Sequence, residues 1–352
     1  MQVDYLIIGQ GISGTFLSYY LLQAGKRVLV IDENNPAAAS RVASGIINPV
    51  TGRRVVTTWM IDELLPFATK AYEDIGHSLG CNVADEIDMV SFHATRQMQS
   101  AWTDRVAEGA DYISHIHDTA RYEKYFHAPY GAGLTFPCLL VDLHSLLPEW
   151  RQKLRESGSL LEEWFDIKQV RVSPGDVNYK DIRAEKLILC NGTGGFDNEF
   201  FGRLPYTMNK GEALIVSIPG LPGGAIYKQG MTIVPMGGDI FWIGSSFEWA
   251  FQHSGPTAEF RTNVESILSG WLNLPYSVIE HKAAIRPSSV ERRPFVGLHP
   301  AMPSVGILNG MGTKGCSLAP YFAHQLTGRL TVGSGIHPEA DVLRFQSLLS
   351  RG

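Results

Sequence analysis

The sequence predicts a mixed α/β fold in which one domain is built on a parallel sheet and a second, mostly antiparallel sheet is inserted into it. Three observations carry this prediction. The chain begins with a strand, a glycine loop, a helix and a second strand; short β-like runs bounded by Gly and Pro fill residues 205–284; and an apolar strand and helix return near the end. A chain of 352 residues is also longer than a domain with a single hydrophobic core usually is, which favours two domains.

Composition and charge narrow the class of protein. A hydrophobic fraction of 44% with 18% charged residues is typical of a globular chain and excludes a disordered one. The 30 Lys and Arg against 35 Asp and Glu give a net charge of −5, which is no strong nucleic-acid signal. Four widely spaced cysteines without a CxxC pair argue against zinc and disulfides. With no apolar run long enough to span a membrane and no signal-peptide pattern, we expect a cytoplasmic protein.

The N-terminal unit predicts a dinucleotide site. An apolar run at residues 5–8 leads into a G-x-G-x-x-G loop, apolar residues at helical spacing up to Gly25, and a second strand at residues 27–31. Glycines in such a loop allow a tight turn and close approach to a pyrophosphate, and Asp32 is placed to accept hydrogen bonds from a ribose, which favours FAD or NAD over NADP. The residues expected at this site are Gly9, Gly11, Ile12, Ser13, Gly14, Asp32 and Glu33.

After residue 32 the chain stops alternating between strands and helices, so we expect the parallel sheet to be assembled from separate segments. Charges on the helix predicted at residues 142–156, among them Arg151, are expected on a solvated face. Residues 80–133 have few clear periodicities. Other predicted helices cover residues 62–79, 259–272 and 318–326; predicted strands cover residues 160–165, 186–190, 213–218, 231–234, 240–243 and 305–308, with a hairpin near Pro174 and Gly175.

Further motifs follow in order along the chain. They are the loop at residues 44–49, the strand and turn at 187–194, the strands at 233–235 and 241–246, the arginine–proline segments at 284–287 and 293–297, and the loop at 309–315 before Ala319 and Pro320. Together with the N-terminal unit, this series resembles the FAD-dependent amine oxidoreductases of the D-amino acid oxidase, glycine oxidase and sarcosine oxidase superfamily. The resemblance covers nearly the whole chain.

The resemblance implies a Rossmann-type FAD-binding domain of the glutathione-reductase type at residues 1–75, 141–204 and 285–352, and a substrate domain at residues 76–140 and 205–284. It implies FAD that is bound without a covalent link. Cys316 is a candidate for a thioether to the flavin, but a small buried residue at a helix start is the better interpretation. Further residues expected near FAD are Arg41, Ser44, Gly45, Ile46, Ile47, Val170, Asn191, Gly192, Thr193, Gly194, Arg286, Gly310, Met311, Gly312, Thr313 and Lys314.

The resemblance also implies a reaction: oxidation of the C–N bond of a small amino acid or N-substituted glycine by hydride transfer to flavin N5. The imine product hydrolyses, and oxygen or another acceptor reoxidises the flavin. Arg286 stands where the family places an arginine for the substrate carboxylate, with a structural salt bridge as the alternative. Lys314 is a second candidate cation, near the carboxylate or flavin N1.

Three further residues are candidates for the substrate pocket, each with an ordinary alternative. Arg53 is a candidate contact for a second acidic group or a solvated surface arginine. Phe247 and Met236 are candidates for the pocket wall or ordinary core residues.

Two other functions stay open. Oxidation of a 2-hydroxy acid uses similar carboxylate binding but needs a base for the hydroxyl proton, and the motif loops offer no histidine for it. The second alternative is a flavoprotein that acts on a modified tRNA base. The acidic balance argues against tight tRNA binding. No pattern indicates a particular oligomeric state.

Overall fold

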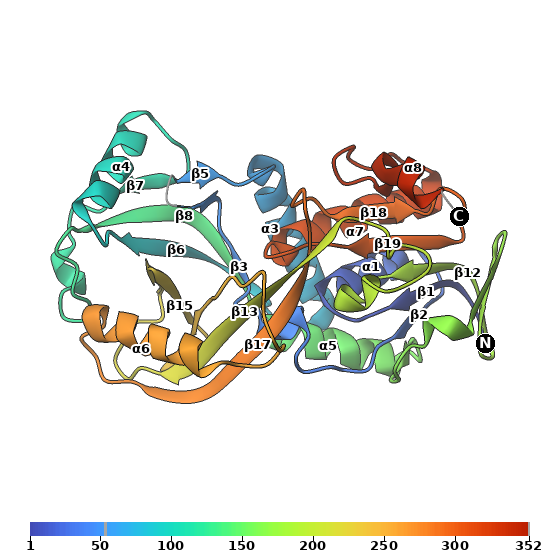
Figure 1. Ribbon diagram of the computed structural model, residues 1–352, viewed down its shortest axis with the longest axis horizontal. Coiled ribbons are helices and arrows are strands. Elements are labelled where there is room, and N and C mark those ends of the chain that lie inside the picture. Colours follow the sequence, from blue (N-terminus) through green and yellow to red (C-terminus); the bar gives the residue numbers. More distant parts are fainter. Residues whose placement is uncertain (53–54, 351–352) are drawn as a thin grey trace.

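The computed structural model describes residues 1–52 and 55–350. Two large sheets lie side by side along the longest axis of the molecule (Figure 1). Both chain ends lie in the half that contains the first sheet. Within the described residues, no helix is both long enough and apolar enough to cross a membrane.

The first sheet has a parallel centre. β1 pairs in parallel with β2 on one side and with β12 on the other, and β12 continues in parallel to β19. A hairpin, β10 and β11, joins β12 in the antiparallel sense. The strands are β1 (Gln2–Ile8), β2 (Val28–Ile31), β9 (Leu160–Leu161), β10 (Val170–Ser173), β11 (Asp176–Tyr179), β12 (Ile182–Leu189), β18 (Phe295–Leu298) and β19 (Val305–Asn309).

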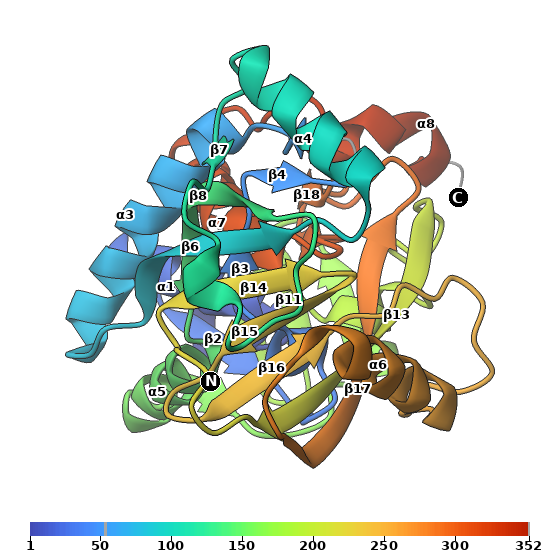
Figure 2. The same cartoon turned by 90° about the vertical axis from the view of Figure 1, so that its left-hand side faces the viewer.

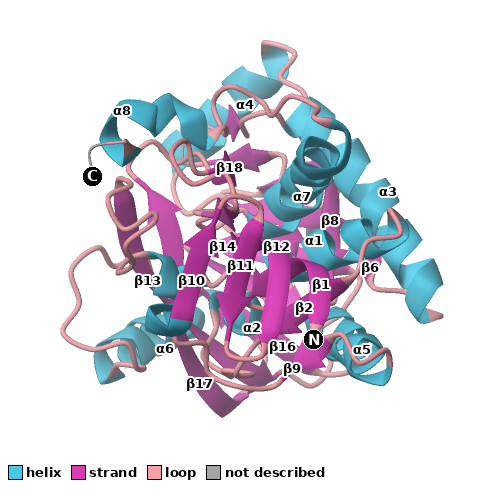
Figure 3. Ribbon diagram, turned by 90° about the vertical axis from the view of Figure 1, so that its right-hand side faces the viewer, coloured by secondary structure: helices cyan, strands magenta, loops and turns pink. Residues whose placement is uncertain are grey.

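Both faces of this sheet are covered, which explains why β1 reads as a continuous apolar run. Tyr5 and Ile7 pack into a core shared with helices, whereas Leu6 and Ile8 pack into a second core on the other face. Figure 3 shows α1 and α7 beside the strands. The helices of the first core are α1 (Ile12–Gln23), α3 (Ile61–Leu79), α5 (Leu143–Glu156) and α7 (Gly315–Val332).

The second sheet is mostly antiparallel, in the order β17-β13-β16-β15-β14-β6-β8-β3, with β7 paired to β8. One parallel pair, β14 with β6, interrupts the pattern. The strands are β3 (Ile46–Ile47), β6 (Ala84–Phe92), β7 (Ile113–His115), β8 (Ala132–Val141), β13 (Tyr206–Ser217), β14 (Ala225–Gln229), β15 (Met231–Pro235), β16 (Ile240–Gly244) and β17 (Ser277–Ser289).

Successive side chains of β13 point to opposite sides of the sheet, so the two faces of this sheet differ. Leu214 and Val216 pack with α6 (Ala258–Trp271), which covers one face; Figure 2 shows α6 in front of β16 and β17. Ala213 and Ile215 point to the opposite face with Trp242. We call this second side the cavity face, because it borders the site described below.

The α/β fold class is confirmed. The helices predicted at residues 62–79, 142–156, 259–272 and 318–326 correspond to α3, α5, α6 and α7. The strand predicted at residues 160–165 is shorter, because only Leu160–Leu161 pair with β2. The unassigned residues 80–133 contain β6, β7, the start of β8 and α4 (Arg96–Ala107). The remaining short elements are α2 (Ala39–Val42), β4 (Val50–Thr51), β5 (Val56–Thr57) and α8 (Gln346–Leu349).

The prediction for Arg151 was wrong. Its side chain is 5% exposed and points into the protein, where Nη1 donates to Asp32 Oδ1 at 2.6 Å and Nη2 donates to Glu162 Oε2 at 2.9 Å. Asp32, at the end of β2, is 119 residues away from Arg151 in the sequence, and Glu162, directly after β9, is 11 residues away. Burial of this arginine is therefore compensated by partners that local periodicity cannot reveal.

Candidate active site

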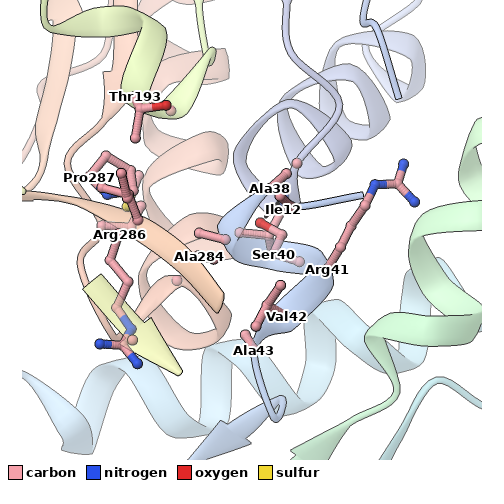
Figure 4. Close-up of a pocket in the computed structure, with 18 of the residues that line it drawn as sticks. Ile12, Ala38, Ser40, Arg41, Val42, Ala43, Thr193, Ala284, Arg286 and Pro287 are labelled. Carbon is pink, nitrogen blue, oxygen red and sulfur yellow. Dashed lines mark hydrogen bonds between the residues drawn. The ribbon is translucent and has the colours of Figure 1, made fainter. Parts of the chain in front are cut away.

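A cavity of ≈1460 Å³ lies between the two sheets. Its lining begins at the ends of the parallel strands, with Ile8, Ile31 and Cys190, and continues over the cavity face of the second sheet. Figure 4 shows Arg41 and Arg286 at opposite sides of this cavity. Carboxyl ends of parallel strands are where open α/β sheets bind ligands, so the location agrees with the predicted dinucleotide site.

The glycine loop is shaped for close backbone approach. Gly9 has φ +98°, and a Cβ there would lie 2.6 Å from the carbonyl oxygen of Cys190. A Cβ on Gly14 would lie 1.8 Å from the carbonyl oxygen of Gly9. Side chains at these two positions would force β1, α1 and β12 apart, so the glycines hold the helix N-terminus against the strand ends.

Asp32 lies at the end of β2, as the sequence predicts. Its Oδ2 accepts from the backbone N of Gln10 at 2.8 Å, and its Oδ1 accepts from Arg151 and from the backbone N of Asn34. These donors hold the carboxylate in one orientation at the cavity wall. An oxygen fixed in this way can still accept from ribose hydroxyls, because each carboxylate oxygen has more than one lone pair.

Two buried polar atoms near the glycine loop lack hydrogen-bond partners among the described residues. Nη2 of Arg41 and Oδ1 of Asn191 are buried without a hydrogen bond, and both residues line the cavity. Burial lowers the pKa of Arg41 below its usual value. Unpartnered buried polar groups are rare and costly, so these atoms fit a polar ligand, and the arginine suits a diphosphate.

Arg286 lies on the cavity face of β17, and its guanidinium has only neutral partners among the described residues. Nη1 donates to Asn209 Oδ1 at 2.6 Å and to the backbone oxygen of Ser246 at 3.1 Å. The guanidinium carbon lies 5.0 Å from the ring centre of Phe247. Burial lowers the pKa of Arg286 to about 10. The salt bridge considered as an alternative is absent from the described part of the chain.

Gly211 makes room for this arginine. It pairs with Ala284 on β17, and a Cβ on Gly211 would lie 1.7 Å from Nη2 of Arg286. The guanidinium therefore crosses directly over the backbone of β13. Asn209, two residues away on the same face, supplies the oxygen that fixes its orientation.

Lys314 precedes α7 and is half-buried, but it is not among the residues that line the cavity. Burial lowers its pKa to about 8, and the nearby charges of Arg293 and Arg292 lower it further. Cys316, two residues on, does line the cavity. It is 8% exposed, and burial raises the pKa of its thiol to about 12.

Most of the residues expected from the sequence come together at this cavity. Phe247 lines its wall although 61% of the residue is exposed. The other expected residues that line it are Gly9, Gly11, Ile12, Ser13, Asp32, Glu33, Arg41, Ser44, Gly45, Ile46, Asn191, Gly192, Thr193, Gly194, Arg286, Met311, Gly312 and Thr313.

The other described residues that were expected at the site do not line it. Gly14 and Gly310 act through the backbone, since a Cβ on Gly310 would lie 3.0 Å from the ring of Phe295. Met236 lies in the turn between β15 and β16, and Ile47 is a buried strand residue paired with Leu139. Val170 begins β10. Arg53 lies outside the described residues.

Sequence reasoning missed three residues of the cavity face. Asn209 and Gly211 position Arg286, and Lys228 projects from β14. Trp242, which belongs to the motif at residues 241–246, lines the cavity and donates from Nε1 to the backbone oxygen of Val42 at 2.9 Å. The alternation of the strands was the available signal, because it places every second residue on one face. It could not tell which face borders the cavity.

Comparison with known proteins identifies the family. The model of the family described as FAD dependent oxidoreductase matches residues 4–329. The chain therefore belongs to this family of FAD-dependent enzymes. A curated relative, the uncharacterized oxidoreductase YurR of Bacillus subtilis (strain 168), is 36% identical over 76 residues, which are 22% of this chain. The match spans only 20% of that relative's length.

Solved structures show the same fold at low identity. Glycine oxidase from Geobacillus kaustophilus has a TM-score of 0.78 and 18% identity, with 96% of this chain and 98% of that chain covered. Iminodiacetate oxidase from Chelativorans sp. BNC1 has a TM-score of 0.75 and 19% identity, with 95% and 96% covered. L-proline dehydrogenase from P. horikoshii has a TM-score of 0.76 and 15% identity, with 98% of each chain covered.

The cavity fits FAD. The glycine loop and the N-terminus of α1 suit the diphosphate together with Arg41, and Asp32 suits the adenosine ribose. The loop with Gly45 and Ile46 and the loop with Met311 and Gly312 line the continuation of the cavity toward the second sheet.

Proposed function

We propose that this FAD-dependent oxidoreductase oxidises the C–N bond of a small amino acid or N-substituted glycine. FAD, when bound, supplies the acceptor for the hydride that leaves the substrate Cα. The imine that results is hydrolysed by water, and oxygen or another acceptor takes the electrons from the flavin. Glycine oxidase and iminodiacetate oxidase, two structural neighbours, carry names that agree with such substrates.

Arg286 is the observation that carries the proposal. A cation that is half-buried, faces the cavity and has only neutral partners in the described part of the chain favours an anionic ligand over a structural salt bridge. Its planar donors suit a carboxylate bound through two hydrogen bonds, which fixes the position of the neighbouring Cα–H. Asn209, the Ser246 backbone and the Phe247 ring hold the guanidinium in place before the substrate arrives.

We also propose that FAD is held without a covalent bond and that the protein works in a reducing compartment such as the cytoplasm. A thiol with a pKa of about 12 is a poor nucleophile, which argues against attachment at Cys316. All four cysteines are free, and free thiols are typical of reducing compartments. Denaturing the purified protein should release the yellow colour into the supernatant, whereas a covalent flavin would stay with the precipitate.

The decisive experiment is anaerobic mixing of the purified yellow protein with glycine, sarcosine, D-amino acids, N-methyl amino acids and 2-hydroxy acids. Loss of flavin absorbance with an amine supports the proposal, and repeating the reaction in air separates an oxidase from a dehydrogenase. Bleaching by 2-hydroxy acids alone would replace C–N by C–O oxidation. If FAD is bound and nothing bleaches it, free amino acids are not the substrates.

A further inference from the structure

Lys228 is a second cation on the cavity face. It lies on β14, is half-buried and lines the cavity. Burial lowers the pKa of its amine below the usual value, and no carboxylate in the described ranges forms an ion pair with it. Lys282 on the edge strand β17 also lines the cavity, but its amine is paired with Glu280 at 3.1 Å.

The two lysines lie in one row of paired residues across the sheet. Lys228 pairs with Thr232, Thr232 with Gly244, Gly244 with Ala213, and Ala213 with Lys282. Gly244, in the middle of the row, makes room for the ring of Trp242, which a Cβ there would approach to 2.6 Å. Arg286 lies on the same strand as Lys282. Four strand spacings, about 19 Å between backbones, separate this strand from that of Lys228, so the two free cations serve different places in the cavity.

The cavity-lining residues beside Lys228 are donors and neutral groups, and the carboxylate whose charge reaches the nearby Cys138 thiol, Asp88, is exposed. Met89 lies on the neighbouring strand β6, and its sulfur is the acceptor of a weak contact from Asn48 Nδ2 at 3.8 Å. Asn48 and the hydroxyl-bearing Thr232 line the cavity as well. Burial raises the pKa of the Cys138 thiol to about 12, so this neighbour is neutral. An ammonium group among donors and neutral atoms suits an anion from outside the chain.

We propose that Lys228 binds a second acidic group of the substrate, away from the carboxylate held by Arg286. The substrate is then an amino acid or N-substituted glycine that carries a further carboxylate, phosphate or sulfonate on its side chain or N-substituent. This inference rests on the proposed function and names its substrate class. It assigns a specificity role to a residue that no motif of the sequence singles out.

The test uses dicarboxylates as molecular rulers. The FAD-loaded enzyme is titrated with succinate, glutarate, adipate and suberate, and with the monocarboxylates of the same lengths, while the visible flavin spectrum reports binding. At one or more chain lengths we expect the diacid to bind about tenfold more tightly than its monoacid. A hydrogen bond between two charged groups can lower the dissociation constant by about this factor. Phosphono-monocarboxylates of the preferred length then compare the two kinds of acidic group.

Lys228→Gln should abolish this preference, with the monoacids bound as before. Lys282→Gln is the matched control, because it removes a lysine from the same row that already has an ion-pair partner, and it should keep the preference. Lys228→Arg retains the positive charge and should also retain the preference for the diacid. This variant keeps the test valid if Lys228→Gln folds poorly.

Three results would overturn the proposal. Diacids and monoacids of every length bind equally well to the unchanged enzyme, or the preference survives in Lys228→Gln. Alternatively, Lys228→Gln shifts the flavin spectrum of the ligand-free enzyme and weakens both series equally, which would mean that the lysine faces the cofactor. Failure of the proposed function looks different: neither series perturbs the flavin, and no amine bleaches it.

Discussion

Among the described residues, Arg286 has no carboxylate partner, and the proposed function assigns its charge to the carboxylate of the substrate. Replacing it by lysine keeps the charge but removes the planar pair of donors. We therefore expect Arg286→Lys to weaken binding of acetate, followed by the flavin spectrum, by about tenfold while FAD content is unchanged. Arg261→Lys on the exposed face of α6 is the control. Equal acetate affinity in the Arg286 variant would contradict a bidentate role.

A second prediction at the scale of the residue is that His93 makes the stability of the protein depend on pH. His93 follows β6, is 5% exposed, and its pKa is lowered to about 4 by burial. Between about pH 6.5 and 4 the unfolded chain therefore binds a proton that the folded protein does not, so the free energy of unfolding falls as pH falls. The shift corresponds to about 3 kcal/mol over this window.

His93→Gln should remove much of that acid sensitivity. The measurement is the thermal midpoint of the protein between pH 7 and pH 4 for both forms, with His253→Gln, an exposed position, as the control. We expect the midpoint of the His93 variant to fall less steeply toward pH 4. A slope identical to that of the unchanged protein would mean that another group dominates the acid response.

At the scale of the element, β13 shapes the site as much as the side chains do. Gly211→Ala would place a methyl group where Nη2 of Arg286 now lies. We expect this variant to keep its FAD and lose at least tenfold in carboxylate affinity, because the guanidinium must move. Gly224→Ala, where a Cβ would meet nothing within 4 Å, is the matched control. Unchanged acetate binding in Gly211→Ala would show that Arg286 is free to bind from another position.

Elements with one apolar face were predictable from the sequence, and elements without one were not. Helices α3 and α5 each bury an apolar stripe against the first core, which produces a clear 3.6-residue period. Helix α4 buries only Trp102, so its period is weak. Strand β6 is exposed at its start and buried at its end, which hides the alternation that identifies a strand.

The residues of the candidate site likewise fall into those that the sequence could predict and those that it could not. The glycine loop and Asp32 were predictable, because the residues that form the nucleotide part are consecutive or nearly so. Arg286 was found through its motif. Asn209 and Gly211, which position the Arg286 side chain, lie on β13, the strand that pairs with β17. Lys228 lines the same cavity from β14, which is four strands away from β17 in the sheet. Such contacts depend on strand order, which local patterns do not contain.

At the scale of the whole molecule, residues of both sheets line the cavity described above. Trp242 of the second sheet donates to the backbone oxygen of Val42 at the end of α2. This hydrogen bond links the second sheet directly to the segment that follows β2 of the first sheet. A ligand that fills the cavity along its length contacts both halves, and a ligand that binds folded but not unfolded protein raises stability by mass action. At one hundred times the dissociation constant this gain is about 2.7 kcal/mol.

FAD should therefore stabilise the protein more than either of its parts does. Asp32, Arg41, Gly45 and Gly312 all line the cavity. If the adenosine half of FAD binds near the first two and the flavin half near the last two, as predicted, ADP and riboflavin each fill one end and only the intact dinucleotide links them. We expect the thermal midpoint of flavin-free protein to rise by several degrees with saturating FAD and by clearly less with ADP, riboflavin or both. Stabilisation by ADP equal to that by FAD would mean that the flavin half contributes nothing to joining the two sheets.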